Sequence, residues 1–334
     1  MDGAKNVVIF GHVSPDGDAM GATLAMEHYL TQKGKQVQVI VPTAYPEFLA
    51  WLPGADRVTV FDYNKPVAHR YIDSSDLMIC MDFGSVQRLE QMAPAVYHHR
   101  VPIITIDHHL DPSLKVSLLI SDPTASSTCE IVFSLLHQLD GMEAITHDIA
   151  ECVYCGMMTD TGSFTYNSNR SEIFHIISLL LTKDIDKDKI YRNVYHNFSV
   201  NRLRLEGYIL HEKMQYFEEE HASLFTLTRE EMKTFQFKKG DSEGFVNLPL
   251  QIQGTKLSIS LREDTEKDVI RVSLRSIDDF PCNRMAEEFF NGGGHLNASG
   301  GSLHTTIVKA VEIARKAIEA YRPLLCDQEK VIKN

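Results

Sequence analysis

The chain has 334 residues, of which 43% are hydrophobic and 23% charged, and this composition excludes a disordered protein. Its formal net charge of −12 argues against a duplex DNA-binding protein, because nonspecific DNA affinity depends on Lys and Arg that neutralise phosphates. The sequence shows neither a basic leader nor eighteen consecutive apolar residues, so we expect a cytoplasmic protein with no membrane contact. The net charge does not decide whether the protein forms a homodimer.

From residue 6 to about 190, short apolar runs alternate with helical patterns, which is typical of βα units around a mainly parallel sheet. Strands are predicted at 6–11, 36–41, 57–61, 76–82 and 101–107. The last two show almost no polar alternation, as expected where both faces of a parallel sheet are covered. Helices are predicted at 19–33, 128–139 and 146–158, and the spacing of Ser127 and Glu130 predicts a capping box for the second.

The second half of the chain has a different pattern. Residues 171–217 are expected to be mainly helical and lead into an acidic stretch. Strands follow near 223–227, 255–262 and 268–275, then a helix near 283–290, a glycine cluster and a helix near 305–322. We therefore predict an α/β domain over 1–195, a helical linker over 196–220 and a smaller α+β domain over 221–334.

Six cysteines lie mostly inside apolar runs, which favours reduced core thiols over a disulfide framework. Cys152 and Cys155 form the one pair with metal-ligand spacing. Because a zinc ribbon needs a second pair, we interpret these two as residues of a buried helix.

Four segments place histidine or aspartate at the ends of predicted elements. A lone aspartate at the end of a strand is more often a cap or turn residue. Here several such residues follow one another along the chain, and the carboxyl ends of parallel strands lie at one edge of the sheet, so together they predict one site. Carboxylate oxygens and imidazole nitrogens suit Mn²⁺, Mg²⁺, Co²⁺ or Fe²⁺ better than an all-thiolate zinc site does. The candidates are His12, Asp16, Asp18, Asp82, Asp107, His108, His109 and Asp160.

These residues resemble the four ordered motifs of the DHH phosphoesterase superfamily, which includes RecJ nucleases, family II pyrophosphatases and small oligoribonucleases. The resemblance implies two divalent ions, with Mn²⁺ the first expectation, that share a bridging Asp82. The implied ligands of one ion are His12, Asp16 and Asp82, and those of the other are Asp18, Asp82, His108 and Asp160. It also implies that His109 contacts the substrate phosphate and that Asp107 orients a ligand histidine. Asp82, Asp107 and His109 are thus the expected catalytic residues.

Residues 291–301 hold five glycines around His295 and resemble the GGGH-containing signature of the DHHA1 domain. Within that resemblance, Arg275 matches a strand arginine that contacts a substrate phosphate, and a guanidinium suits bidentate phosphate binding. The implied substrate-binding residues are Arg275, Ser276, Gly293, Gly294, His295 and Asn297.

The chain looks most similar to the compact group of bifunctional oligoribonucleases (nanoRNases) and pAp phosphatases, some of which are labelled exopolyphosphatase-related. The resemblance implies a nucleic acid-binding hydrolase that cleaves short oligoribonucleotides to mononucleotides, or removes the 3′-phosphate of 3′-phosphoadenosine 5′-phosphate (pAp). A phosphodiesterase for cyclic di-AMP or linear dinucleotides and an exopolyphosphatase stay open, because the same metal site serves all of them. A nucleotide-sensing module is the alternative outside the enzymes.

Overall fold

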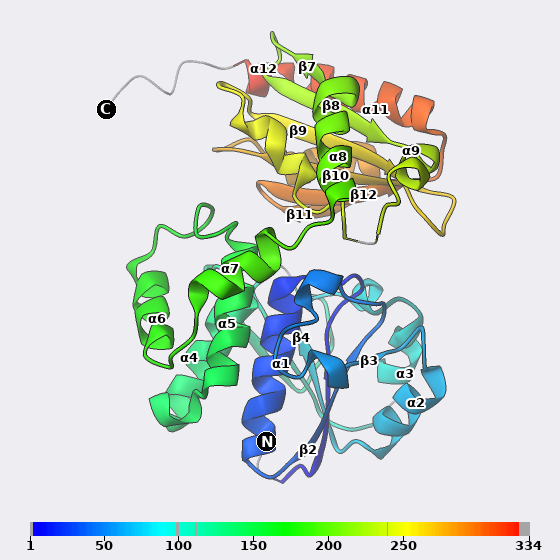
Figure 1. Cartoon of the computed structure of the whole chain (residues 1–334). Helices are drawn as coiled ribbons and strands as arrows, with labels where there is room; N and C mark the ends of the chain where they lie inside the picture. The colour runs from blue at the N-terminus through cyan, green and yellow to red at the C-terminus, as the bar shows by residue number, and fades with distance from the viewer. Residues whose placement is uncertain (1–2, 98–99, 111, 239, 327–334) are drawn as a thin grey trace. The chain divides into compact units, whose positions relative to one another are not determined.

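The chain divides into two compact units, Met1–Asn197 and Phe198–Asn334. They are described by a computed structural model, which covers residues 3–97, 100–110, 112–238 and 240–326. The first unit contains a six-stranded parallel sheet flanked by helices, and the second a six-stranded mixed sheet with its own helices (Figure 1). This confirms the predicted fold class. Among the described residues, no helix is both long and apolar enough to cross a membrane.

The first sheet has the strand order β3-β2-β1-β4-β5-β6, with every pair parallel. The order changes direction between β1 and β4, and ligands of such sheets bind at the carboxyl ends of the strands beside this switch point. All five predicted strands are present, while β6, a short edge strand with two exposed leucines, was not predicted. The strands are β1 Asn6–Phe10, β2 Gln36–Val41, β3 Thr59–Val60, β4 Leu77–Met81, β5 Ile103–Asp107 and β6 Leu118–Ser121.

Helices cover both faces of this sheet (Figure 1). On one face lie α1 Gly17–Gln32, α4 Thr128–Asp140 and α5 His147–Asp160, with α6 Ser171–Leu181 and α7 Lys187–Tyr195 packed outside them against α5. On the other lie α2 Lys65–Ser74 and α3 Ala93–Tyr97. Short 3₁₀ turns are η1 Glu47–Leu49, η2 Ala55–Arg57, η3 Val86–Met92 and η4 Met142–Ala144. The free cysteines Cys152 and Cys155 are buried in α5, as predicted.

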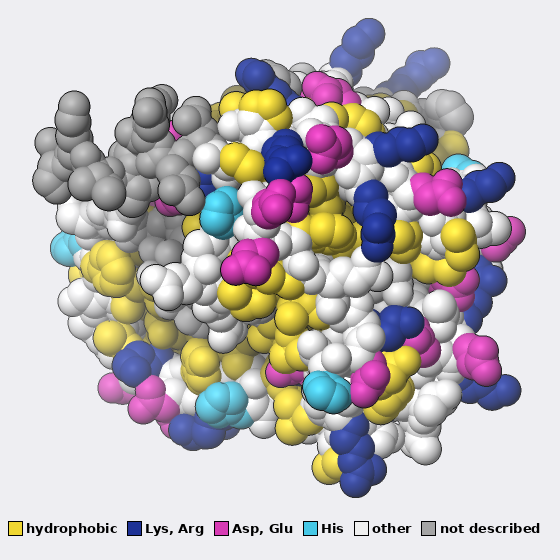
Figure 2. Space-filling view, turned by 90° about the horizontal axis from the view of Figure 1, so that it is seen from above, with side chains coloured by type: hydrophobic (Ala, Val, Ile, Leu, Met, Phe, Trp, Pro, Cys, Tyr) yellow, Lys and Arg dark blue, Asp and Glu magenta, His cyan; other side chains and the backbone are white. Residues whose placement is uncertain are grey.

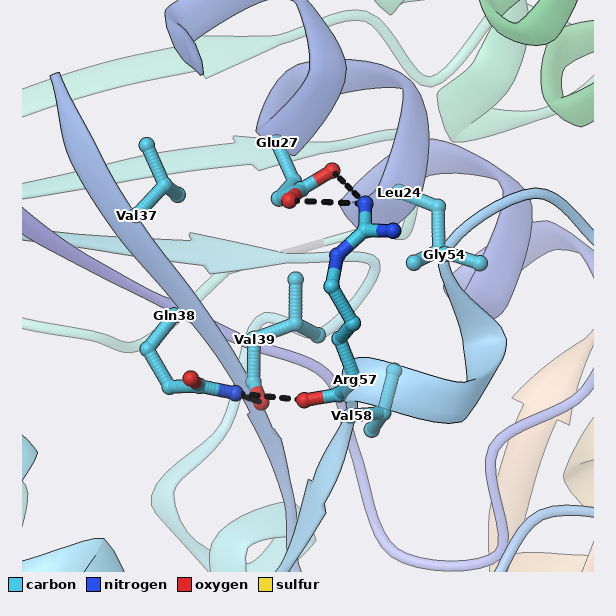
Figure 3. Close-up of a pocket in the computed structure, with 8 residues that line it drawn as sticks. All are labelled: Leu24, Glu27, Val37, Gln38, Val39, Gly54, Arg57 and Val58. Carbon is cyan, nitrogen blue, oxygen red and sulfur yellow. Dashed lines mark hydrogen bonds and ion pairs between the residues drawn. The ribbon is translucent and has the colours of Figure 1, made fainter.

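A small cavity of about 50 Å³ lies between α1, β2 and η2 (Figure 3). Arg57 Nη2 lies 3.0 Å from both carboxylate oxygens of Glu27, and the Gln38 side chain donates to the Arg57 carbonyl at 2.7 Å. These contacts fasten η2 to helix α1. Substrate pockets are usually several hundred Å³ in volume, so this cavity is part of the packing.

The second sheet has the strand order β11-β12-β10-β9-β8-β7, and β8–β9 is its parallel pair. Helices α10 and α11 pack on one face, while α8, α9 and η6 pack around β8 on the other. The elements are α8 Val200–Tyr208, a π turn Ile209–Lys213, β7 Gln215–Phe217, β8 Ala222–Leu227, α9 Arg229–Thr234, η6 Phe245–Gln251, β9 Leu257–Glu263, β10 Ile270–Ser276, α10 Cys282–Phe290, β11 Gly293–His295, β12 Ala298–Leu303, α11 Ile307–Ala320 and α12 Arg322–Leu325.

The structure adds detail in two regions. Most of the expected linker over 196–220 forms α8, the π turn and strand β7 of the second unit, and its Leu205 and Ile209 are buried against Phe225 and neighbouring side chains. The glycine cluster, for which no element was predicted, forms a hairpin of β11 and β12. Glycine runs suggest loops because they lack side chains, yet here the missing side chains let backbone segments approach each other.

Candidate functional site

The turn between β1 and α1 carries His12 and Asp16. The His12 ring is 2% exposed, and its Nδ1 lies 2.7 Å from the Val13 carbonyl oxygen. This contact turns Nδ1 toward Val13 and leaves Nε2 as the nitrogen that faces the carboxylates and could bind a metal ion. Nε2 lies 3.4 Å from Asp82 Oδ2 and 3.9 Å from Asp16 Oδ2. It is buried and has no hydrogen-bond partner in the described part of the chain.

Asp16 and Asp18 each hold a helix terminus. Asp16 Oδ1 caps α1 by accepting from the backbone amides of Asp18 and Ala19. Asp18 is buried and reaches the first turn of α4, where Thr128 N donates to its Oδ2 at 2.6 Å and Cys129 N donates to its Oδ1 at 2.9 Å. These charge-assisted bonds fix the Asp18 carboxylate in place.

Asp82 lies at the centre of the site, directly after β4. Its Oδ2 faces His12 Nε2 at 3.4 Å, and its Oδ1 lies 3.6 Å from His108 Nε2. Thr128 Oγ1 donates to Oδ1 at 2.8 Å. The backbone φ of 64° is in the left-handed region, which aspartate tolerates better than most residues. One carboxylate therefore faces two histidines with different oxygens, as a bridging ligand must.

His108, after β5, and Asp160, the last residue of α5, complete the other side. The His108 ring is buried, and its Nδ1 lies 3.4 Å from the Ala125 carbonyl oxygen, so Nε2 is again the nitrogen that faces the carboxylates. That Nε2 lies 3.5 Å from Asp160 Oδ2 and 4.0 Å from Asp18 Oδ2. Two groups of candidate ligands that have donor atoms within 4.8 Å of one another are His12, Asp16 and Asp82, and Asp18, His108 and Asp160.

The donors fit divalent cations. Histidine nitrogens face carboxylate oxygens at 3.4–4.0 Å, which is too long for good hydrogen bonds but suits atoms that share an ion. Burial, and then the negative charges of Asp82 and Asp160, raise the pKa of Asp18 well above its ordinary value. Burial also acts to raise the pKa of Asp82, but the His12 contact and the neighbouring histidines outweigh it and hold this pKa well below its usual range. Such crowded carboxylates carry an electrostatic cost that a cation would offset.

His109 and Asp107 form a pair beside the candidate ligands. Asp107 is fully buried, and its Oδ1 accepts from His109 Nδ1 at 2.7 Å and from the His109 backbone amide at 3.2 Å. Burial acts to lower the pKa of His109, but the Asp107 bond and the charge of Asp82 raise it to about 9. The sequence suggested that Asp107 orients a metal-ligating histidine, whereas the histidine that it holds in the structure is His109.

Two residues near the site were not predicted. Thr128 lies between Ser127 and Glu130, the two residues of the predicted capping box. Ser127 does cap α4, but the Glu130 carboxylate accepts from Ser126 instead of Ser127. The capping signal was local, so it did not indicate that Thr128 reaches Asp82. Arg88 in η3 is the second: its carbonyl accepts from Val13 N at 2.8 Å, and its charge acts on the His109 pKa.

Thr128→Val tests the contribution of the Thr128 hydroxyl. Valine keeps the shape and both backbone bonds to Asp18 but removes the donor to Asp82 Oδ1. Mutation of a residue that orients a metal ligand typically lowers metal affinity or activity by about 10–100-fold. We therefore expect Thr128→Val to lose metal affinity in that range, as measured by calorimetry. Thr128→Ser, which keeps the hydroxyl, is the matched control and should stay near wild type. Equal affinities for the valine variant and wild type would contradict this role.

The predicted substrate-binding residues of the second unit gather around β10, β11 and β12. Arg275 is half-buried near the end of β10, and its Nη1 donates to the Leu274 carbonyl. Ser276 is buried; its hydroxyl donates to the Phe280 carbonyl and accepts from Asn297 Nδ2. These bonds hold the turn after β10, so the Ser276 hydroxyl and the Asn297 side-chain amide are already hydrogen-bonded within the fold.

The glycine hairpin is shaped by backbone packing. Gly294 has a φ of 142°, and a Cβ there would lie 2.6 Å from the Ala298 carbonyl oxygen. Gly293 is less crowded, with its nearest side chain at 3.8 Å. His295 ends β11 opposite Ala298, and its carbonyl accepts from the Ser299 hydroxyl. Gly294 is therefore required by the hairpin itself.

Comparison with known proteins gives a consistent result. Residues 6–157 match the DHH family, N-terminal domain, and residues 227–321 match the DHHA1 domain. A probable bifunctional oligoribonuclease and PAP phosphatase NrnA from Streptococcus mutans is 28% identical over 302 residues, which are 90% of each chain. The bifunctional oligoribonuclease and PAP phosphatase NrnA from Bacillus subtilis is 24% identical, again over 90% of each chain.

A solved structure is more similar. An exopolyphosphatase-related protein from Bacteroides fragilis is 49% identical, covers 96% of this chain and 94% of its own, and superposes with a TM-score of 0.91. Identity at this level over nearly the whole of both chains extends the match beyond the two domain models. The chain belongs to the DHH family of phosphoesterases, hydrolases that act on phosphate esters, and carries a DHH N-terminal domain followed by a DHHA1 domain.

Proposed function

We propose that this chain is a cytoplasmic enzyme that hydrolyses short oligoribonucleotides to mononucleotides and removes the 3′-phosphate of pAp. The observation that carries the proposal is the pair of histidine and aspartate groups joined by Asp82. The similarity to oligoribonuclease and PAP phosphatase enzymes over most of the chain supports this substrate class.

In this proposal the site holds two divalent ions, Mn²⁺ first among them. His12, Asp16 and Asp82 hold one, and Asp18, Asp82, His108 and Asp160 hold the other. Two such ions, when bound, activate water and offset charge on the phosphoryl group. Asp18 is kept in position by the α4 amides, and the two histidine rings by the carbonyls that their Nδ1 atoms contact.

His109, positioned by Asp107, contacts the phosphate that is cleaved, and Asp82 takes part in the reaction as the ligand shared by the two ions. Arg275, His295 and the hairpin glycines bind another phosphate or nucleotide group of the substrate, with Ser276 and Asn297 shaping the adjoining turn. The first domain thus carries the metal ions and the second carries substrate recognition.

The surface charge is compatible with a small anionic substrate. On the face drawn in Figure 2, Lys and Arg side chains are interspersed with Asp and Glu rather than gathered into one basic stripe. Proteins that bind duplex DNA nonspecifically present such a stripe. This face therefore offers no support for a duplex ligand.

A substrate panel tests the proposal. We expect the purified chain with Mn²⁺ to hydrolyse RNAs of two to five nucleotides and pAp faster than cyclic di-AMP or polyphosphate. Chelation of the metal should abolish turnover of every substrate. Preferential hydrolysis of polyphosphate or cyclic di-AMP would replace the proposed substrate class, and tight nucleotide binding without turnover would favour a sensing module.

Arg275→Ala tests the substrate-binding role of the second domain. Loss of a guanidinium that binds phosphate removes a charge-assisted interaction, so we expect KM for a dinucleotide to rise by about tenfold or more with a smaller change in kcat. The KM of Arg275→Lys, which keeps the charge but not the bidentate geometry, should lie between those of wild type and Arg275→Ala. An unchanged KM for Arg275→Ala would remove Arg275 from the substrate site.

A further inference from the structure

Two arginines lie side by side on the second sheet. Arg262 of β9 and Arg271 of β10 are direct register partners. Because side chains alternate along a strand, Arg275 lies on this same face, four residues from Arg271. The opposite face of β9 and β10 packs under α10 and α11 with Leu257, Ile259, Leu261, Ile270, Val272 and Leu274.

Arg262 is half-buried but poorly paired. Its contact with an aromatic ring places the guanidinium carbon 5.7 Å from the centroid of Phe237, and no residue in the described ranges gives it a hydrogen bond or ion pair. Burial lowers the pKa of Arg262, as withdrawal of a cation from water should. Its neighbour Arg271 is paired, with Nε donating to Asp264 Oδ2 at 2.7 Å.

The charge of Asp264 acts on both arginines, but of these two side chains its carboxylate bonds only to Arg271. Its Oδ1 accepts from the backbone amides of Glu266 and Lys267, each at 2.9 Å, and its Oδ2 accepts from Arg271. Two neighbouring guanidiniums thus share one carboxylate that is already committed. A partly desolvated, poorly paired cation costs free energy, so its natural partner is an anion from outside the chain.

The spacing along β10 indicates which anion. Four residues of strand separate the Cα atoms of Arg271 and Arg275 by about 13 Å. Side chains at that separation can each hold a different phosphate of one short strand. The positions between them carry small, half-buried residues, Ser273 and its partners Ser260 and Gly300, which leave room for an extended ligand.

We propose that Arg262, with Arg271 beside it, binds a backbone phosphate of the substrate other than the one that Arg275 binds. This inference rests on the proposed function and deepens it: the second domain distinguishes oligonucleotides by length, because a longer strand offers Arg262 a backbone phosphate that a dinucleotide lacks. Arg262 is then a specificity residue for substrates of three or more nucleotides.

Binding measured without turnover tests the inference. Labelled RNAs of five and two nucleotides are titrated with the full chain in the presence of a chelator, and fluorescence anisotropy reports the affinity. We expect Arg262→Gln to weaken binding of the longer RNA by about tenfold, since one charged hydrogen-bonding group is lost, while dinucleotide binding stays within about twofold. Arg204→Gln is the matched control, because Arg204 is an exposed arginine of the same unit, and should change neither affinity.

Three results would overturn the inference: unchanged affinity of Arg262→Gln for the longer RNA, equal losses for both RNAs, or a lowered Tm of Arg262→Met. Methionine removes a poorly paired charge and keeps much of the side-chain volume, so this variant should melt no lower than wild type unless Arg262 is structural. If wild type hydrolyses no substrate of the panel yet binds the longer RNA through Arg262, the proposed function fails and this inference stands.

Discussion

Asp82→Asn is expected to abolish hydrolysis of every phosphate ester that the chain cleaves. Asp82 presents one oxygen to His12 and the other to His108, so it faces a histidine of each group of candidate ligands and is the proposed shared ligand. Mutation of a residue that only orients a metal ligand lowers metal affinity or activity by about 10–100-fold. We therefore expect substitution of a shared ligand to lower kcat/KM by more than about a hundredfold. Asparagine is the sharpest substitution, since it keeps the size and tolerates the positive φ of this position.

Metal content is the second measurement on this variant. If Asp82 bridges two ions, Asp82→Asn should bind fewer equivalents of Mn²⁺ than wild type, in parallel with the loss of turnover. Asp76→Asn is the matched control, because Asp76 also flanks β4 but lies at its other end, where it accepts from the amides of Lys5 and Asn6. That control should keep full metal content and activity. Wild-type turnover of Asp82→Asn would refute the proposed metal centre.

The strand ends of the first unit were predictable because sequence and topology agree there. Buried parallel strands appear as unbroken apolar runs, and a histidine or aspartate directly after such a run must lie at the carboxyl edge of the sheet. His12 follows β1, Asp82 follows β4 and His108 follows β5, and these three strands are neighbours. The proximity of these side chains thus follows from strand order.

Other features depend on contacts that no local pattern records. The bonds from Thr128 and Cys129 to Asp18 join residues more than 100 positions apart in the chain. The edge strand β6 has two exposed leucines in succession, so it lacks the alternation that identifies a half-buried strand. In the second unit, β11 and β12 consist largely of glycine and serine, whose strand propensity is low, and pairing with β10 overrides that preference.

Close packing of α1 against α5 is a further requirement that the structure reveals. Gly21 of α1 and Gly156 of α5 lie at this contact, and a Cβ on Gly21 would come within 2.4 Å of the Cys152 carbonyl oxygen. The same close packing of the two helices brings Asp18 of α1 near Asp160 of α5. Both carboxylates lie within 4.0 Å of His108 Nε2. Helix separation and site geometry are therefore linked through two glycines.

Gly156→Ala should consequently damage both stability and activity. The new Cβ would lie 2.2 Å from Cys129 Sγ and 2.9 Å from Asp18 Oδ1, closer than real contacts allow, so α5 or Asp18 must move. Overpacking of a core costs about 1–3 kcal/mol, and we expect a loss of that size in the free energy of unfolding, measured by denaturant titration. Displacement of a ligand by about 1 Å should also lower kcat/KM by about a hundredfold.

Two further variants separate the crowding from a general effect of alanine. Gly207→Ala, in helix α8 with no atom within 4 Å of its Cβ, should leave stability unchanged or raise it by about 0.5–1 kcal/mol. In the double variant Gly156→Ala with Cys129→Ala, the sulfur that the new methyl group meets is gone, so much of the lost stability should return. Activity should recover less, because the crowding against Asp18 persists. A Gly156→Ala protein with wild-type stability and turnover would show that the helix contact does not set the geometry of the site.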